Sequence, residues 1–93
     1  MAQPIIQYRL TDHAKEEMAR RQISAQDVAR TLADPGQTEK LREGRVVYQA
    51  KIESGEPKTL YLIRVFVDIH RIPAEVVTVY RTSKIHKYWR NDA

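Results

Sequence analysis

The chain has 93 residues, 42% hydrophobic and 30% charged, a balance that is typical of one folded domain and excludes general disorder. No apolar segment approaches the roughly 20 residues of a transmembrane helix, the first ten residues lack a secretory pattern, and the absence of cysteine favours a cytoplasmic location. The formal net charge of +4 is a mild excess that permits a polyanionic partner without requiring one. We therefore expect a single domain over residues 1–93 that does not associate with a membrane.

The first third of the sequence predicts a short strand and two helices. Residues 5–10 alternate between apolar and polar side chains, as in a strand. Thr11 is a suitable N-cap for a helix from residue 12 to about residue 21. Ser24 opens a second helix with capping-box spacing, and Asp34-Pro35-Gly36 ends it.

The rest of the sequence is rich in β-formers and predicts a sheet. Glycine- and proline-containing turns separate the apolar runs, and short connections of this kind join antiparallel neighbours. Two N-terminal helices packed on a twisted antiparallel sheet of about four strands would form a two-layer α+β sandwich. The expected strands are residues 39–41, 46–52, 58–69 and 75–81.

The C-terminal segment is basic and aromatic. From Arg81 to Arg90 there are four Lys or Arg residues and no acid, with Tyr88 and Trp89 among them. Such a segment can bind phosphates and stack on bases. The alternative is a terminal helix capped by Thr82 or Ser83, and we interpret Tyr88 and Trp89 as core residues of that helix.

His13 is the first candidate catalytic residue. On a helix, His13, Glu17 and either Arg20 or Arg21 share one side. A histidine, an orienting carboxylate and a cation are sufficient to cleave RNA without a metal, because the 2′-hydroxyl of RNA supplies the nucleophile. The same residues would also form an ordinary solvated helix face.

A second polar cluster lies where the last strand meets the C-terminal segment. The residues from Tyr80 to Lys84 combine hydroxyl groups with two cations, which could hold a phosphate, or could simply cap a helix and solubilise a strand. Further possible phosphate ligands are Arg45, Arg64 and Lys87. The three histidines are scattered and no glycine-rich phosphate loop is present, so we expect neither a metal site nor a cofactor.

Two segments resemble a known family. Residues 11–24, from Thr11-Asp12-His13-Ala14 to Ile23-Ser24, resemble the opening of the domain-of-unknown-function 4258 family, and residues 76–82 resemble its closing strand. That family is similar to the RelE- and BrnT-like toxins, so the resemblance implies a RelE-like two-layer sandwich and a metal-independent endoribonuclease of a toxin–antitoxin system, with an antitoxin-like protein partner. His13 matches the histidine of the family motif, and Gln22 replaces a glycine that often precedes the isoleucine.

The sequence thus leads to a ribonuclease hypothesis with two alternatives. The hypothesis assigns catalysis to His13, Tyr80, Arg81 and Lys84, and RNA binding to Arg45, Arg64, Thr82 and Lys87. One alternative is a non-catalytic RNA- or protein-binding module on the same fold. The other is an interaction domain whose exposed strand edge pairs with an antitoxin-like peptide.

Overall fold

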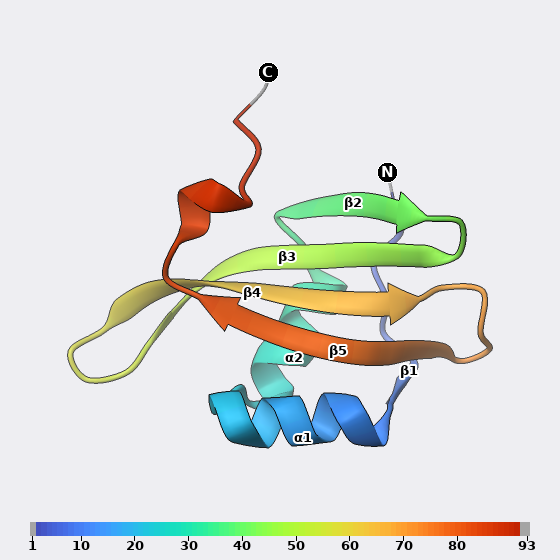
Figure 1. Ribbon diagram of the computed structural model, residues 1–93, viewed down its shortest axis with the longest axis horizontal. Coiled ribbons are helices and arrows are strands. Elements are labelled where there is room, and N and C mark those ends of the chain that lie inside the picture. Colours follow the sequence, from blue (N-terminus) through green and yellow to red (C-terminus); the bar gives the residue numbers. More distant parts are fainter. Residues whose placement is uncertain (1, 92–93) are drawn as a thin grey trace.

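The structure is a computed structural model that describes residues 2–91. It contains two helices and five strands, followed by a short 3-10 turn (Figure 1). In chain order the elements are β1 (Tyr8–Leu10), α1 (Asp12–Arg21), α2 (Ala25–Ala33), β2 (Gln37–Arg42), β3 (Arg45–Ser54), β4 (Thr59–Asp68), β5 (Ala74–Thr82) and the 3-10 turn (Ile85–Lys87). The α+β class is confirmed, and no helix among the described residues has the length and apolarity to cross a membrane.

The two helices begin at the caps that the sequence predicts. The Thr11 hydroxyl accepts from the Ala14 amide at 3.1 Å, and the Ser24 hydroxyl accepts from the Asp27 amide at 3.0 Å. Helix α1 ends at Gln22, which adopts the left-handed conformation with φ of 56°. The C-cap therefore takes a conformation that glycine adopts without strain and that other residues adopt less readily.

The sheet has five strands and is mixed, whereas the sequence predicted an antiparallel sheet of about four strands. Its order is β1-β5-β4-β3-β2, and only the β1–β5 pair is parallel. Short turns set the antiparallel direction of β2 to β5. Strand β1 has no such turn to β5: both helices and three strands separate the two in the chain, so connection length does not determine how they pair.

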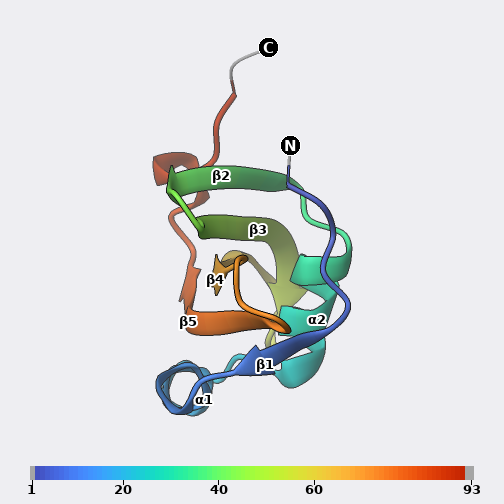
Figure 2. The ribbon, with the colours of Figure 1, turned by 90° about the vertical axis from the view of Figure 1, so that its right-hand side faces the viewer.

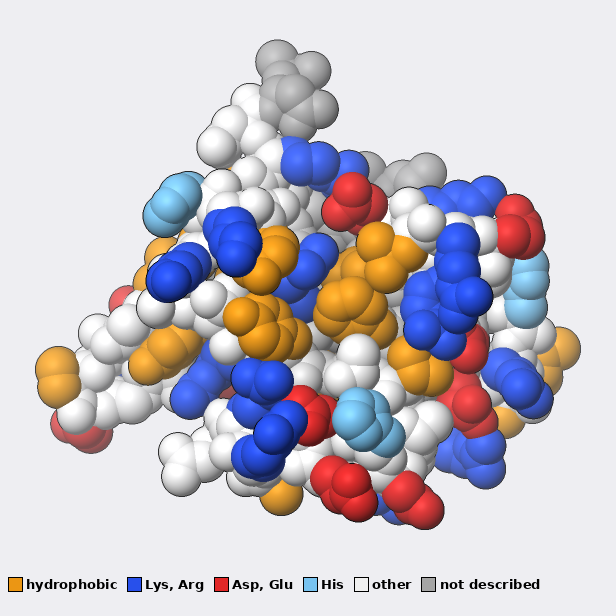
Figure 3. All heavy atoms as spheres, in the orientation of Figure 1, with side chains coloured by type: hydrophobic (Ala, Val, Ile, Leu, Met, Phe, Trp, Pro, Cys, Tyr) orange, Lys and Arg blue, Asp and Glu red, His pale blue; other side chains and the backbone are white. Residues whose placement is uncertain are grey.

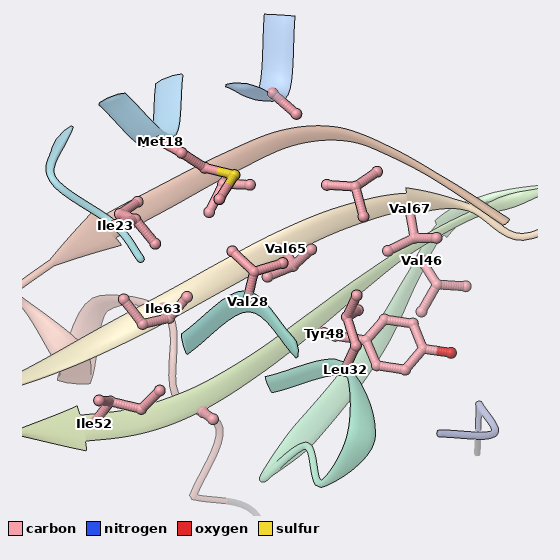
Figure 4. Packing of buried hydrophobic residues seen from close by; sticks show 14 residues of the cluster. Met18, Ile23, Val28, Leu32, Val46, Tyr48, Ile52, Ile63, Val65 and Val67 are labelled. Carbon is pink, nitrogen blue, oxygen red and sulfur yellow. The ribbon is translucent and has the colours of Figure 1, made fainter. Parts of the chain in front are cut away.

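The hydrophobic core lies between the helices and one face of the sheet (Figures 2 and 4). Helix α2 covers that face of β3 and β4, and α1 runs beside β5. Tyr48 is buried among aliphatic side chains, and its hydroxyl donates to the Gln3 carbonyl oxygen at 2.6 Å. The core comprises Ala14, Met18, Ile23, Val28, Leu32, Val46, Tyr48, Ala50, Ile52, Ile63, Val65, Val67, Val76 and Val79.

The opposite face of the sheet carries a row of polar and aromatic residues, and we call it the open face. Its central members are Gln49, Arg64, Phe66, Thr78 and Tyr80. Because side chains alternate across a strand, the register that places Gln49 opposite Arg64, and Arg64 opposite Tyr80, puts all three on this face.

The C-terminal tail (residues 83–91) crosses the open face rather than entering the core, so the interpretation of Tyr88 and Trp89 as core residues is wrong. Both side chains are only partly buried. The Trp89 ring packs against Gly36, where a Cβ atom would come within 2.7 Å of Cη2, and Lys51 Nζ lies 4.2 Å from its centroid. Glycine at position 36 thus provides the surface on which the tail packs.

Candidate functional site

Arg64 stands at the centre of the open face, on the middle strand of the sheet. Its Nε donates to Gln49 Oε1 at 3.0 Å, and its Cζ lies 4.3 Å from the Tyr88 ring centroid and 5.4 Å from that of Phe66. Burial lowers the pKa of the Arg64 guanidinium, yet arginine keeps its charge in proteins. Within residues 2–91 no carboxylate pairs with Arg64 and its Nη atoms make no hydrogen bond, so the charge is available to an anion.

A hollow of about 370 Å³ opens beside Arg64. Two strands, helix α1 and the C-terminal tail contribute to its walls. Figure 3 shows this face of the molecule, with apolar side chains at its centre and Lys and Arg side chains around them. The lining residues are Glu17, Arg21, Arg64, Phe66, Thr78, Val79, Tyr80 and Tyr88.

Glu17 organises the helix side of the hollow. It is only 8% exposed and accepts from Arg21 Nε at 2.9 Å and from Arg20. The Arg21 hydrogen bond is the largest cause that lowers the pKa of Glu17, so the carboxylate stays ionised. Its described partners are the two arginines, not His13, which corrects the expectation that Glu17 orients the histidine.

Tyr80 contributes a phenol whose pKa is lowered by its surroundings. Its ring meets that of Tyr88 edge-on, with centroids 6.0 Å apart, and the Cζ of Arg21 lies 4.9 Å from the Tyr80 centroid. The neighbouring hydroxyl groups of Tyr88, and after it of Thr82, lower the pKa of the Tyr80 phenol. A phenol with a lowered pKa gives up its proton more readily near neutral pH.

The structure brings part of the predicted site together on the open face. Tyr80 and Arg64 are direct neighbours on adjacent strands, and Thr82 lies two residues beyond Tyr80 on the same face. Lys87 Nζ is 5.6 Å from the Tyr88 centroid. Lys84 is exposed and precedes the 3-10 turn, at the start of the tail.

Arg81 and Arg45 lie away from the hollow. Arg81 sits opposite the core residue Ile63, so it points to the helix face, where its Nη1 donates to the Gln22 carbonyl oxygen at 3.5 Å. Arg45 binds Asp68 at 2.6 Å and lowers the pKa of that carboxyl group. Four residues of strand separate Arg45 from Gln49, or about 13 Å.

His13 is exposed in the first turn of α1. Glu17 follows it by four residues, which places the two side chains on the same helix face, about 6 Å apart along the axis. Glu17 lines the hollow, whereas His13, one helical turn before it, is not among the lining residues. It makes no hydrogen bond to the described part of the chain.

Sequence reasoning missed Gln49 and misplaced Tyr88. Gln49 is 2% exposed and contacts both Arg64 and the tail. An uncharged polar residue inside the apolar run 46–52 is a signal that could have identified it, because a buried amide requires partners. The position of Tyr88 depends on how the tail folds back onto the sheet, and no nearby residues in the sequence indicate this path.

These features define a small α+β domain whose sheet carries a hollow centred on Arg64 and walled by aromatic side chains. Residues 10–81 match a family described as Domain of unknown function (DUF4258), so the chain belongs to that family, as its sequence motifs predict. No curated protein and no solved structure matches the chain significantly. Within the described residues, no three His, Cys, Asp or Glu side chains are placed to share a metal ion.

Proposed function

We propose that this protein is an endoribonuclease of the toxin type, which cleaves RNA through the substrate's own 2′-hydroxyl group at the open face. The observation that carries the proposal is the pairing of Arg64 with Tyr80. A partly buried guanidinium with unoccupied donors stands beside a phenol whose pKa is lowered. These are the two properties that phosphodiester cleavage requires of side chains, namely positive charge and proton transfer.

The proposed reaction is an internal transesterification. A base removes the 2′-hydroxyl proton, the 2′-oxygen forms a bond to phosphorus, and the bond from phosphorus to the 5′-oxygen breaks. The departing 5′-oxygen takes up a proton from an acid. The products are a 2′,3′-cyclic phosphate and a 5′-hydroxyl end, and no co-reactant is consumed.

Each role has a candidate on the open face or at its edge. Arg64 donates to the phosphate oxygens with the Nη groups that no described residue occupies. Tyr80 transfers one proton, and His13, from the adjoining turn of α1, transfers the other. Lys84 and Lys87 bind neighbouring phosphates. Sequence reasoning also assigned catalysis to Arg81, but its position on the helix face favours a structural role.

The direct test is incubation of the purified protein with an end-labelled single-stranded RNA in the presence of EDTA, with and without ribosomes. We expect cyclic-phosphate ends, and no cleavage of the same RNA carrying 2′-O-methyl groups. Arg64→Lys and Tyr80→Phe should each slow cleavage by about 100-fold. Arg30→Lys, on the exposed side of α2, is the matched control. Absence of cleavage under both conditions would contradict the proposal.

The alternative, a non-catalytic binding module, is supported by the same aromatic and cationic walls, because stacking and phosphate contact need no proton transfer. RNA binding that is lost in Arg64→Lys, without any cleavage, would favour it. A toxin also requires a partner that neutralises it, so we propose an antitoxin-like protein. Growth arrest on cytoplasmic expression, relieved by co-expression of a neighbouring gene, would support this part of the proposal.

A further inference from the structure

We infer that Gln49 is a positioning residue whose single side-chain amide holds the Arg64 guanidinium and the C-terminal tail in one arrangement, so that the site is complete only when the tail lies across the open face. The inference deepens the proposed function, because it concerns the same site. Its contacts, however, are properties of the chain alone.

The chemistry of Arg64 fixes the direction of the Gln49 amide. An arginine side chain has donors and no acceptor, so the atom of Gln49 that faces Arg64 Nε at 3.0 Å must be the oxygen. The amide nitrogen then points the other way. It donates to Gln37 Oε1 at 2.8 Å and toward the Tyr88 carbonyl oxygen at 3.4 Å. A reversed amide would place its NH₂ group against the guanidinium.

Gln37 connects the Gln49 amide to the tail through hydrogen bonds of its own. Its Oε1 accepts from the Arg90 amide at 3.1 Å as well as from Gln49, and its Nε2 donates to the Arg90 carbonyl oxygen at 2.6 Å. Gln37 therefore binds both polar groups of one tail residue. A continuous row of side-chain amides runs from Arg64 on the central strand to Arg90, and Tyr88, a wall of the hollow, lies between its ends.

Because Gln49 is buried, each polar atom of its amide requires a hydrogen-bond partner. Gln49 is 2% exposed, and no buried side-chain nitrogen or oxygen of residues 2–91 lacks a partner. A buried amide that loses one partner leaves a polar atom unsatisfied, so the arrangement favours all of its contacts together over any subset. Gln49 contacts Arg64 on one side and Gln37 and the tail on the other. A change in the packing of the tail should therefore alter the hydrogen bond of Arg64, and the reverse.

Two spectroscopic readouts test this coupling without RNA. The Arg64 Nε–H signal, assigned with Arg64→Lys, reports the bond to Gln49 through its position and its hydrogen-exchange rate. The emission of Trp89, the one tryptophan in the sequence, reports the packing of the tail. The variants are Gln49→Leu and Gln37→Ala, with Gln26→Leu, an exposed glutamine on α2, as the matched control.

We expect Gln49→Leu to speed exchange of the Arg64 Nε–H by about tenfold or more and to shift Trp89 emission to longer wavelength. Gln37→Ala leaves Arg64 and its acceptor in place, yet should produce both changes to a smaller extent. Gln26→Leu should produce neither. If Gln49→Leu does not fold, the result for Gln37→Ala tests the coupling by itself. A shift of Trp89 emission with an unchanged Arg64 signal would overturn the coupling. No change in either signal would also overturn it. Failure of the unmodified protein to bind RNA would contradict only the proposed function.

Discussion

The acidity of Tyr80 depends on a single neighbouring hydroxyl more than on any charge. The Tyr88 hydroxyl is the largest cause that lowers the pKa of Tyr80 from its usual value of 10.0. In Tyr88→Phe the ring that contacts Arg64 is retained and the hydroxyl is lost. We therefore expect the pKa of Tyr80 to rise toward its usual value, as followed by a pH titration of ¹³C-labelled tyrosine rings.

If Tyr80 acts as the general base, the limb of the pH–rate profile that reports its deprotonation should move to higher pH by the same amount in Tyr88→Phe. Tyr8→Phe, which removes a hydroxyl from β1, serves as the control and should leave the profile in place. A rise in the pKa of Tyr80 without any movement of this limb would show that another group, such as His13, is the base.

At the scale of elements, the helices could be predicted because their signals are local. Thr11 and Ser24 cap through residues three positions away, so the sequence itself contains both partners. Strand β1 is different. Its parallel pairing with β5 depends on where the whole chain returns, and a three-residue strand carries little pattern of its own.

The sequence identified several residues of the candidate site, but which of them share one face of the sheet follows only from the alternation of side chains along each strand. Arg64 and Tyr80 were identified, and the structure makes them neighbours. Arg81 was grouped with Tyr80, although adjacent residues of a strand point to opposite faces. Trp89 was assigned to the core as part of a predicted terminal helix. A second apolar surface, on the far side of the sheet, cannot be told from the core by composition.

The tail packs against Gly36, the residue before β2, and this contact predicts an effect on stability whose sign depends on Trp89. Gly36 does not have a positive φ, so alanine suits its backbone, but the added Cβ would lie 2.7 Å from the Trp89 ring. We expect Gly36→Ala to lower the free energy of unfolding by about 1 kcal/mol and to shift Trp89 emission to longer wavelength. Urea titration and fluorescence measure the two effects.

Trp89→Leu provides the background that isolates this contact. Without the indole ring, Gly36→Ala should cost nothing, or stabilise by about 0.5 kcal/mol, because alanine reduces the freedom of the unfolded chain. An equal loss of stability in both backgrounds would mean that the alanine disturbs β2 itself rather than the tail.

At the scale of the whole molecule, several carboxylates make the fold sensitive to acid. Arginine or lysine partners lower the pKa of Glu17, Glu43 and Asp68 in the folded chain. A lowered pKa contributes stability that is fully present above the unfolded value and is lost as the pH falls through the folded value. We expect the free energy of unfolding, measured in urea, to decline below about pH 5.

Glu17 should account for part of this decline, because it is buried and binds two arginines. Glu17→Gln should be less stable than the unmodified protein at neutral pH, and the two should converge in acid, where the carboxylate is protonated in both states. Glu56→Gln, in an exposed turn, is the matched control. Parallel curves for Glu17→Gln and the unmodified protein would show that the arginine contacts do not contribute to stability.

The shape and charge of the open face also predict which form of RNA binds. The hollow beside Arg64 has a volume of about 370 Å³ and aromatic walls, so we expect it to receive a base only if that base is unpaired. A duplex can contact the surrounding cations through its phosphates but cannot fill the hollow. A single strand that meets three cations should lose about 20-fold in affinity between about 50 and 200 mM salt.

Fluorescence anisotropy with one labelled strand, free or annealed to its complement, measures this preference. The single strand should bind at least about tenfold more tightly at the higher salt concentration, where phosphate contacts alone are weak. Tyr88→Leu should remove most of the difference, because it takes away one wall of the hollow, whereas Lys84→Gln should weaken both forms alike. Equal affinity for the two forms would instead assign RNA binding to the exposed cations of the tail and leave the hollow without a ligand.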